Sequence, residues 1–135
     1  MTEVHAESDI VHHPSGLSVS ATPLAGIPWL RHGSTTRSFS TADSPRLGDL
    51  QKMQQHLGMH SSFLAYAQQK HTNHVAAVNA ELARSDGDTF FHQFPETDAL
   101  VCAIPNVTIA IMTADCAPVF LADPEKEMVA LGHAG

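Results

Sequence analysis

The final third of the chain constrains the fold most strongly, because its apolar segments are separated only by short turns. Residues 99–103 are apolar, and Pro105 and Asn106 end that run. Residues 107–112 then alternate Val or Ile with Thr, Ala and Met, so both faces of the segment are nearly apolar. This pattern is typical of a strand that is covered on both sides. We therefore expect a sheet in the interior of the fold.

A turn sequence, Asp123-Pro124-Glu125-Lys126, separates two further apolar segments, residues 118–122 and 128–131. Pro suits the second position of such a turn because its φ is fixed near −65°. A two-residue loop would place Cys116 directly opposite His133, whereas a four-residue loop would make the pair diagonal. In either register the thiol and the imidazole are neighbours.

The remaining sequence predicts one clear helix and more short strands. Apolar residues at helical spacing over residues 47–57 predict the helix, and Gly58 is a candidate for its C-cap. Segments 63–69 and 74–78 are expected to form strands, whereas residues 90–97 are expected to form a loop. Residues 80–88 fit either a short helix or a loop. Several strands with few helices indicate an α/β or α+β class.

The 135 residues are enough for one domain or part of one. Residues 1–16 are mostly polar and end in Pro14-Ser15-Gly16, so we expect a mobile N-terminal tail, followed by the domain over residues 17–135. The chain ends at His133-Ala134-Gly135, directly after an apolar segment. Domains more often end in a polar tail or a docked helix, and we therefore expect this chain to be truncated.

Charge and cysteine content narrow the class of partner and the compartment. Seven Lys and Arg against fourteen Asp and Glu give a formal net charge of −7, which argues against binding to nucleic acid. Two cysteines are too few for a disulfide framework, and the first ten residues show no secretory signal. The longest apolar stretch, residues 99–112, is too short to span a bilayer. We expect a cytoplasmic protein without a membrane partner.

Histidine is unusually abundant, with 10 in 135 residues or about 7%, and it is the commonest metal ligand. Cys116 and His133, separated by 16 residues, allow three interpretations. They suit a zinc or copper site, or the nucleophile and base of an acyl-transfer enzyme. They also fit a buried thiol with a histidine nearby by chance. The spacing alone does not decide between these.

The run from Met112 to Val119, followed by Gly132-His133-Ala134-Gly135, resembles the YfiH-like family, whose pattern is T-A-D-C-x-P-V and then H-A-G-W-R. This family has been called the laccase-domain or multicopper polyphenol oxidase family, and its members are also described as purine nucleoside phosphorylases. Weaker similarities lie in the right order at residues 31–37, 69–72 and 97–101. The resemblance implies a layered α/β fold with a mixed sheet, of which this chain is the N-terminal part.

The resemblance also implies a metal site in which one Cys and two His are the ligands. By motif position these are His71, Cys116 and His133, and they are the catalytic residues that the family would use. Three protein ligands with an open position are typical of catalytic zinc, with copper as the second choice of metal. Arg37 is expected to contact a substrate anion, because guanidinium matches phosphate geometry; the alternative is an arginine that lies at the surface or braces its loop. Asp115 either orients a ligand from outside the coordination sphere or stabilises the strand bend.

For such a protein the resemblance implies phosphorolysis of adenosine, inosine, guanosine or methylthioadenosine, and deamination of adenosine. Its partners would be a purine nucleoside and phosphate, and we expect a monomer. Copper-dependent oxidation of phenols is the second hypothesis, although no H-x-H pair, which multicopper oxidases usually need, occurs in the sequence. Two more hypotheses are a metal-free Cys-His hydrolase or amidase and a non-catalytic fragment. Whether the 135-residue chain is active alone stays open.

Overall fold

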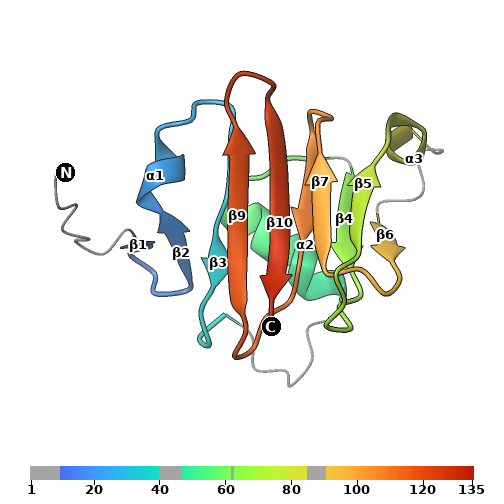
Figure 1. Ribbon diagram of the computed structural model, residues 1–135. Coiled ribbons are helices and arrows are strands. Elements are labelled where there is room, and N and C mark those ends of the chain that lie inside the picture. Colours follow the sequence, from blue (N-terminus) through green and yellow to red (C-terminus); the bar gives the residue numbers. More distant parts are fainter. Residues whose placement is uncertain (1–9, 40–46, 62, 85–90) are drawn as a thin grey trace, which may run out of the picture. The chain divides into compact units, whose positions relative to one another are not determined.

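The computed structural model describes residues 10–39, 47–61, 63–84 and 91–135 (Figure 1). The chain divides into two compact units, Met1–Met59 and His60–Gly135. Within the segment expected to be a tail, Ile10–His12 form strand β1, which pairs with a later strand. Residues 1–9 lie outside the described part.

Among its described residues, the first unit contains a three-stranded antiparallel sheet and two helices. The sheet order is β1-β2-β3, and the helices follow β2 and β3 in the chain. The bounds are β2 Ser18–Ala21, α1 Thr22–Ala25, β3 Ser34–Thr35 and α2 Leu47–His56. Helix α2 confirms the predicted helix, and Gly58 follows it with φ 69°, as expected of a C-cap glycine. The buried Ser18 hydroxyl lies 2.9 Å from Nε2 of His56, which joins β2 to the end of α2.

The second unit contains two sheets. One has the order β6-β4-β8, and its strands are all parallel; the other is mixed, with the order β5-β7-β10-β9. The bounds of the parallel strands are β4 Phe63–Ala67, β6 Phe91–Phe94 and β8 Val107–Ala110. Those of the mixed sheet are β5 Val75–Val78, β7 Ala99–Cys102, β9 Ala117–Asp123 and β10 Met128–Ala134. The structure thus confirms a mixed-sheet α/β fold.

Two features of this unit refine the expectations from sequence. Residues 91–94, expected to lie in a loop, form β6, because β4 offers them a parallel partner from Leu64 to Ala67. Helix α3, Ala80–Arg84, agrees with a short helix in that segment rather than a loop. Its first turn is capped by Asn79, whose Oδ1 accepts a hydrogen bond of 2.9 Å from the Leu82 N–H.

The β9–β10 hairpin has the longer of the two loops considered. Met128 pairs with Asp123 and His133 pairs with Pro118, so residues 124–127 form a four-residue loop. The two-residue register is therefore wrong. The longer loop is stabilised by Oδ1 of Asp123, which accepts the N–H groups of residues 125 and 126, and by Glu127 with φ 51°.

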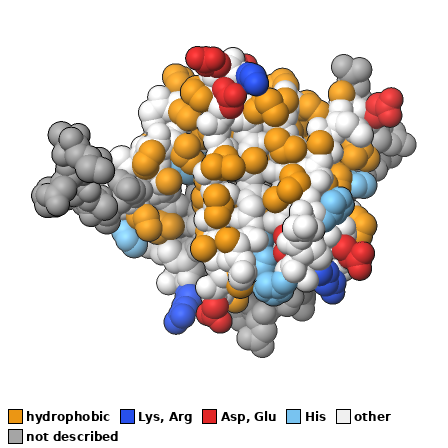
Figure 2. Space-filling view, viewed as in Figure 1, with side chains coloured by type: hydrophobic (Ala, Val, Ile, Leu, Met, Phe, Trp, Pro, Cys, Tyr) orange, Lys and Arg blue, Asp and Glu red, His pale blue; other side chains and the backbone are white. Residues whose placement is uncertain are grey.

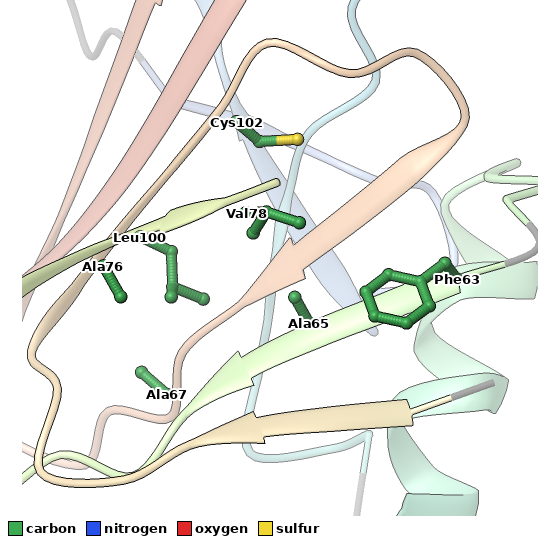
Figure 3. Packing of buried hydrophobic residues seen from close by; sticks show 7 residues of the cluster. All are labelled: Phe63, Ala65, Ala67, Ala76, Val78, Leu100 and Cys102. Atoms are coloured by element: carbon green, nitrogen blue, oxygen red, sulfur yellow. The ribbon is translucent and has the colours of Figure 1, made fainter. Parts of the chain in front are cut away.

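The core of the second unit is formed by residues of both sheets (Figure 3). Strand β4 contributes one aromatic and two small side chains, and β5 and β7 contribute from the mixed sheet. The residues are Phe63, Ala65, Ala67, Ala76, Val78, Leu100 and Cys102. The alanines leave space for the other sheet to approach closely, and Leu100 fills the middle with no exposed surface.

The opposite face of the mixed sheet, here called the outer face, is also apolar. Strand pairing aligns two rows across it, Val75-Ala99-Gly132-Val119 and Ala77-Val101-Ala130-Leu121. Figure 2 shows apolar side chains gathered over β9 and β10. Val75 is 58% exposed and Leu121 62% exposed. Among the described residues, no helix is both long and apolar enough to cross a membrane.

Candidate metal centre

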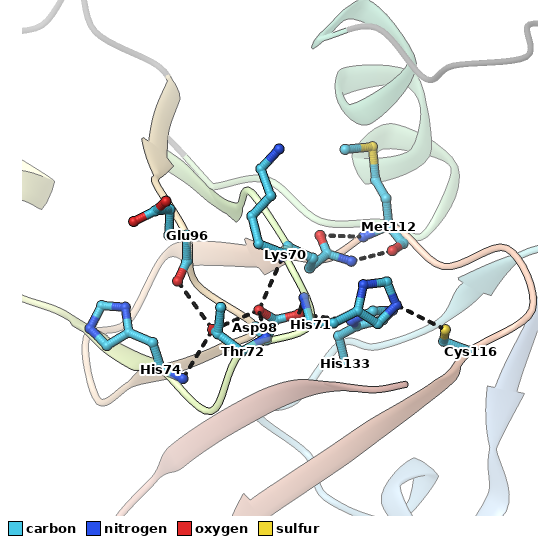
Figure 4. Close-up of polar contacts among 10 residues, drawn as sticks. Lys70, His71, Thr72, His74, Glu96, Asp98, Met112, Cys116 and His133 are labelled. Atoms are coloured by element: carbon cyan, nitrogen blue, oxygen red, sulfur yellow. Dashed lines mark hydrogen bonds and ion pairs between the residues drawn. The ribbon is translucent and has the colours of Figure 1, made fainter.

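Three predicted ligands, distant in sequence, meet at one end of the mixed sheet (Figure 4). His71 lies in the loop after β4, Cys116 directly precedes β9, and His133 lies in β10. One ligand atom from each can be chosen so that all three lie within 4.8 Å of one another. Sγ of Cys116 is 3.7 Å from Nε2 of His71. The rings of His71 and His133 meet edge to face, with centroids 4.9 Å apart.

A buried carboxylate, Asp98, organises this cluster from directly before β7. Its Oδ1 accepts hydrogen bonds from the His71 N–H at 3.0 Å and from Nδ1 of His133 at 2.9 Å. Its Oδ2 accepts the N–H groups of Lys70 at 3.1 Å and Thr72 at 2.8 Å, and also the Thr72 hydroxyl at 2.8 Å. Asp98 therefore connects the loop that carries one histidine to the side chain of the other.

The loop at His71 has a conformation that the carboxylate stabilises. His71 has φ 58°, in the left-handed region that few residues other than glycine adopt, although histidine is enriched there. Three successive N–H groups, of residues 70 to 72, point at the same carboxylate. Consecutive N–H groups around a left-handed residue form a concave site for an anion. The Asp98 side chain occupies that site.

The ionisation of Asp98 determines the tautomer of His133. Burial raises the pKa of Asp98, but the hydrogen bonds from Thr72, His133 and Lys70 outweigh it and hold the pKa well below its ordinary value. Asp98 is therefore a carboxylate at neutral pH and can only accept. Nδ1 of His133 must carry the shared proton, which leaves Nε2 available for a cation.

Backbone and side-chain hydrogen bonds fix the segments around the cluster. The His133 N–H donates to the Asp98 carbonyl at 2.7 Å, and the Asp98 N–H donates to the His74 carbonyl at 3.1 Å. The Gln69 side chain bonds both backbone groups of Met112, donating to its carbonyl and accepting its N–H. Gln69 thus connects the His71 loop to the segment that leads to Cys116.

The donor set fits a metal ion. Zinc binds thiolate at about 2.3 Å and imidazole at about 2.0–2.1 Å, so two ligand atoms on a tetrahedral centre lie roughly 3.5 Å apart. The separation between Sγ of Cys116 and Nε2 of His71 is close to that value. One thiolate with two imidazoles suits zinc and also copper. His71, Cys116 and His133 are therefore the residues that would hold the ion.

Space beside these ligands is limited at Gly135. A Cβ atom there would collide with the His71 ring and would lie 3.5 Å from Sγ of Cys116. A glycine is therefore needed at this position if His71 keeps its orientation. Next to His133 and Asp98 lies a shallow cavity of about 150 Å³, bordered also by Thr72, His74 and Val119. It is smaller than the roughly 300–1,000 Å³ of typical ligand pockets.

The sequence also predicts Arg37 and Asp115 as site residues, and their roles stay predictions. Arg37 belongs to the first unit, in an exposed turn after β3, and its contact with an anion stays a prediction. Asp115 is exposed in the segment before β9. The carboxylate that bonds a candidate ligand is instead Asp98, which in the sequence belongs only to the weaker motif at residues 97–101. Its position within that motif is the one sequence signal for a role at the site.

The second cysteine has a different environment. Cys102 is 3% exposed in the core, and its Sγ lies 3.5 Å from the Ile104 carbonyl oxygen. Burial raises the pKa of the Cys102 thiol. Cys116, in contrast, is partly exposed and free of disulfide bonding. Cys102 is therefore a core thiol, whereas Cys116 is accessible enough to bind a metal ion.

Comparison with known proteins identifies the family. A sequence model described as multi-copper polyphenol oxidoreductase laccase matches residues 32–135. A purine nucleoside phosphorylase of Deinococcus radiodurans is 32% identical over 130 residues, covering 89% of this chain and 48% of that protein. The adenosine deaminase RL5 of an unknown prokaryotic organism is 33% identical over 79 residues, covering 58% of this chain and 30% of that protein.

A solved structure supports the same relationship. The hypothetical protein YfiH of Bacillus licheniformis aligns with a TM-score of 0.55 and 27% identity, over 65% of this chain and 33% of that chain. The chain spans less than half the length of the phosphorylase and the deaminase that it matches. A family match over residues 32–135 and a shared fold agree with the T-A-D-C and H-A-G segments around the cluster. The chain belongs to the YfiH-like, or multi-copper polyphenol oxidoreductase laccase, family.

Proposed function

We propose that this chain supplies the metal centre of an enzyme that acts on purine nucleosides. The reactions are phosphorolysis of adenosine, inosine, guanosine or methylthioadenosine, and deamination of adenosine to inosine. One observation carries the proposal: a thiol and two imidazoles converge within 4.8 Å. This occurs in a chain whose relatives are named purine nucleoside phosphorylase and adenosine deaminase.

Zinc is the proposed metal, held by His71, Cys116 and His133. When bound, zinc supplies Lewis acidity and the activation of water near neutral pH. The chain's own residues orient the ligands: Asp98 holds the proton on Nδ1 of His133, so Nε2 can face the ion. We also propose that the enzyme is cytoplasmic, because both cysteines are free thiols.

Phosphorolysis also requires a site for the second substrate. Phosphate oxygen replaces the purine nitrogen at the sugar carbon, so the base leaves while the sugar gains a phosphate. We assign Arg37 to the phosphate, since a guanidinium group donates two parallel hydrogen bonds to its oxygens. Deamination instead uses water, whose oxygen replaces the amino group on the purine carbon, and gives ammonia and inosine. Only phosphorolysis therefore depends on this arginine.

The test combines metal content with product analysis. The purified 135-residue chain is loaded with zinc, and bound metal is counted by mass spectrometry. It is then incubated with adenosine and phosphate, and inosine, adenine and ribose 1-phosphate are separated by chromatography. The C116A variant, which lacks the thiolate, is the matched control. About one zinc per chain, with product above this control, supports the proposal; zinc binding no stronger than that of C116A overturns it.

Copper-dependent oxidation of phenols is the second candidate, because the family model is described as a multi-copper laccase and the donor set also suits copper. Within the described residues, however, His71, Cys116 and His133 are the one group of three close metal-ligating side chains. An oxidase with several coppers needs more such groups. Oxygen uptake by the copper-loaded chain with a phenol would favour this candidate.

A further inference from the structure

We propose that Asp98 is the positioning residue of the metal centre, fixing both imidazole ligands before the ion binds. The part of this inference that concerns the ion rests on the proposed function. The part that concerns the arrangement of the ligands does not, because it applies to the metal-free chain. One carboxylate thereby holds two ligands that are 62 positions apart in the sequence, His71 and His133.

The first line of support comes from the His71 loop. Asp98 accepts five hydrogen bonds, four of them from residues 70–72 and one from His133. Without the carboxylate, three consecutive N–H groups would lose their acceptor, and the left-handed backbone at His71 would lose its compensation. The loop would then relax, and the ring of His71 would no longer face Cys116.

The second line of support comes from His133. Its side chain is 6% exposed, and that of Asp98 is 4% exposed, so their 2.9 Å contact is shielded from water. A carboxylate here accepts a hydrogen bond from the Nδ1–H group, and it excludes the tautomer in which the proton blocks Nε2. The same residue thus sets the backbone of one ligand and the tautomer of the other.

The Asp98→Asn substitution tests whether the hydrogen bonds of Asp98, rather than its volume alone, position the ligands. An amide has nearly the same shape as the carboxylate, but it has one acceptor oxygen and a donating NH₂ group. That NH₂ group would face either the N–H groups of Lys70 and Thr72, or the His71 N–H together with Nδ1 of His133. At least one set of hydrogen bonds is lost, whichever way the amide is turned.

Glu96→Gln is the matched control. Glu96 lies two residues before Asp98, and it is exposed, unlike Asp98. Its backbone carbonyl, not its carboxylate, accepts the Thr72 hydroxyl. The substitution removes the same charge near the same loop. An effect of charge alone would therefore weaken zinc binding in both variants, whereas an effect of positioning would weaken it only in the Asp98 variant.

The experiment measures the metal-free chain and the zinc-loaded chain separately. Zinc affinity is obtained by competition with a chromogenic chelator, and we expect D98N to bind about 10–100-fold more weakly, as is usual when an outer partner of a metal ligand is lost. E96Q should stay near the parent value. In the metal-free chain, nitrogen NMR should show His133 with its proton on Nδ1, and hydrogen exchange should show slow amides at residues 70–72. At least one of these signatures should be lost in D98N.

Each part of the inference can fail separately. If the parent chain binds no zinc, the proposed function fails, and the metal-free signatures still test the positioning role. Unchanged His133 tautomer and amide exchange in D98N would overturn that role, as would equal loss of zinc affinity in E96Q. Should D98N not fold, the parent chain decides, because fast exchange at residues 70–72 or a proton on Nε2 of metal-free His133 also overturns it.

Discussion

Nδ1 of His133 lies 2.9 Å from Oδ1 of Asp98, with both side chains almost entirely buried. In this contact Nδ1 donates a hydrogen bond to the carboxylate, and Nε2 remains available to bind a metal ion. It also places the ionised form of Asp98 where a change of protonation affects the His71 loop as well as His133. The free energy of unfolding of this region should therefore depend on pH.

We expect the parent chain to lose stability as the pH falls below the ordinary aspartate pKa of 3.8. The folded-state pKa of Asp98 lies below that value, so the folded state binds the proton less readily than the unfolded state. The stabilisation is complete above the ordinary pKa and is lost progressively in more acidic solution. Urea unfolding of parent and D98N between pH 7 and pH 3 tests this. The difference between the urea midpoints of the two proteins should become smaller towards pH 3. A difference that stays constant with pH would contradict the prediction.

Gly135→Ala should weaken zinc binding, because the new methyl group would collide with the His71 ring. Overpacking costs about 1–3 kcal/mol, and about 1.4 kcal/mol is a factor of ten, so the affinity should fall about tenfold or more. Chelator competition measures the change. Gly26→Ala is the control, since a Cβ atom there meets nothing within 4 Å. Equal affinities of the two variants would show that His71 is free to move aside.

The two cysteines should differ in their reaction with a thiol reagent. Cys116 is partly exposed, whereas Cys102 is 3% exposed with a raised pKa, and the thiolate is the reactive form. In the native metal-free chain, mass spectrometry after brief alkylation should find the label on Cys116 and almost none on Cys102. Zinc should protect Cys116. Labelling of Cys116 at the same rate with zinc present would argue against coordination by this thiol.

Leu100→Ala should destabilise the fold strongly, because Leu100 has no exposed surface and lies in the shared core. Truncation of a buried leucine costs about 2–5 kcal/mol. Leu121→Ala makes the same chemical change at a residue that is 62% exposed, and it should change the unfolding free energy by less than about 0.5 kcal/mol. Urea denaturation of the two variants compares them directly. Similar losses would mean that the outer face is covered in solution.

Arg37→Ala should impair phosphorolysis and spare deamination if Arg37 contacts phosphate. Hydrogen bonds to charged groups contribute about 1.5–3 kcal/mol, which corresponds to roughly 10–100-fold in the phosphate dependence of the rate. Product ratios from adenosine, at several phosphate concentrations, measure the effect. Arg31→Ala is the control, because Arg31 donates to the carbonyls of Pro28 and Leu30. Equal loss of both reactions in the Arg37 variant would exclude a phosphate-specific role.

The motif residues could be predicted from the sequence, because each ligand lies in a short and recognisable segment. The hairpin register could not, since it depends on the hydrogen bonds of Asp123 and on the left-handed backbone of Glu127. Strand β6 was missed for a similar reason: residues 91–94 have no alternating pattern of their own and become a strand by pairing with β4.

The role of Asp98 is the clearest case of information that local sequence does not carry. Its hydrogen-bond donors come from residues 70–72 and from His133, so no window around residue 98 contains them. Proximity along the chain favoured Asp115, the neighbour of Cys116. In the folded chain, the pairing of β7 with β10 instead brings Asp98, the residue before β7, next to His133.

The two aliphatic rows on the outer face have a consequence for how the protein behaves in a flask. Water in contact with alkyl groups is unfavourable by about 25 cal/mol for each Å², and sulfate strengthens that penalty. Solutions of the 135-residue chain should therefore precipitate at modest ammonium sulfate concentrations, despite a net charge of −7. The Leu121→Lys substitution, at a residue of those rows that is 62% exposed, should raise the salt concentration needed for precipitation.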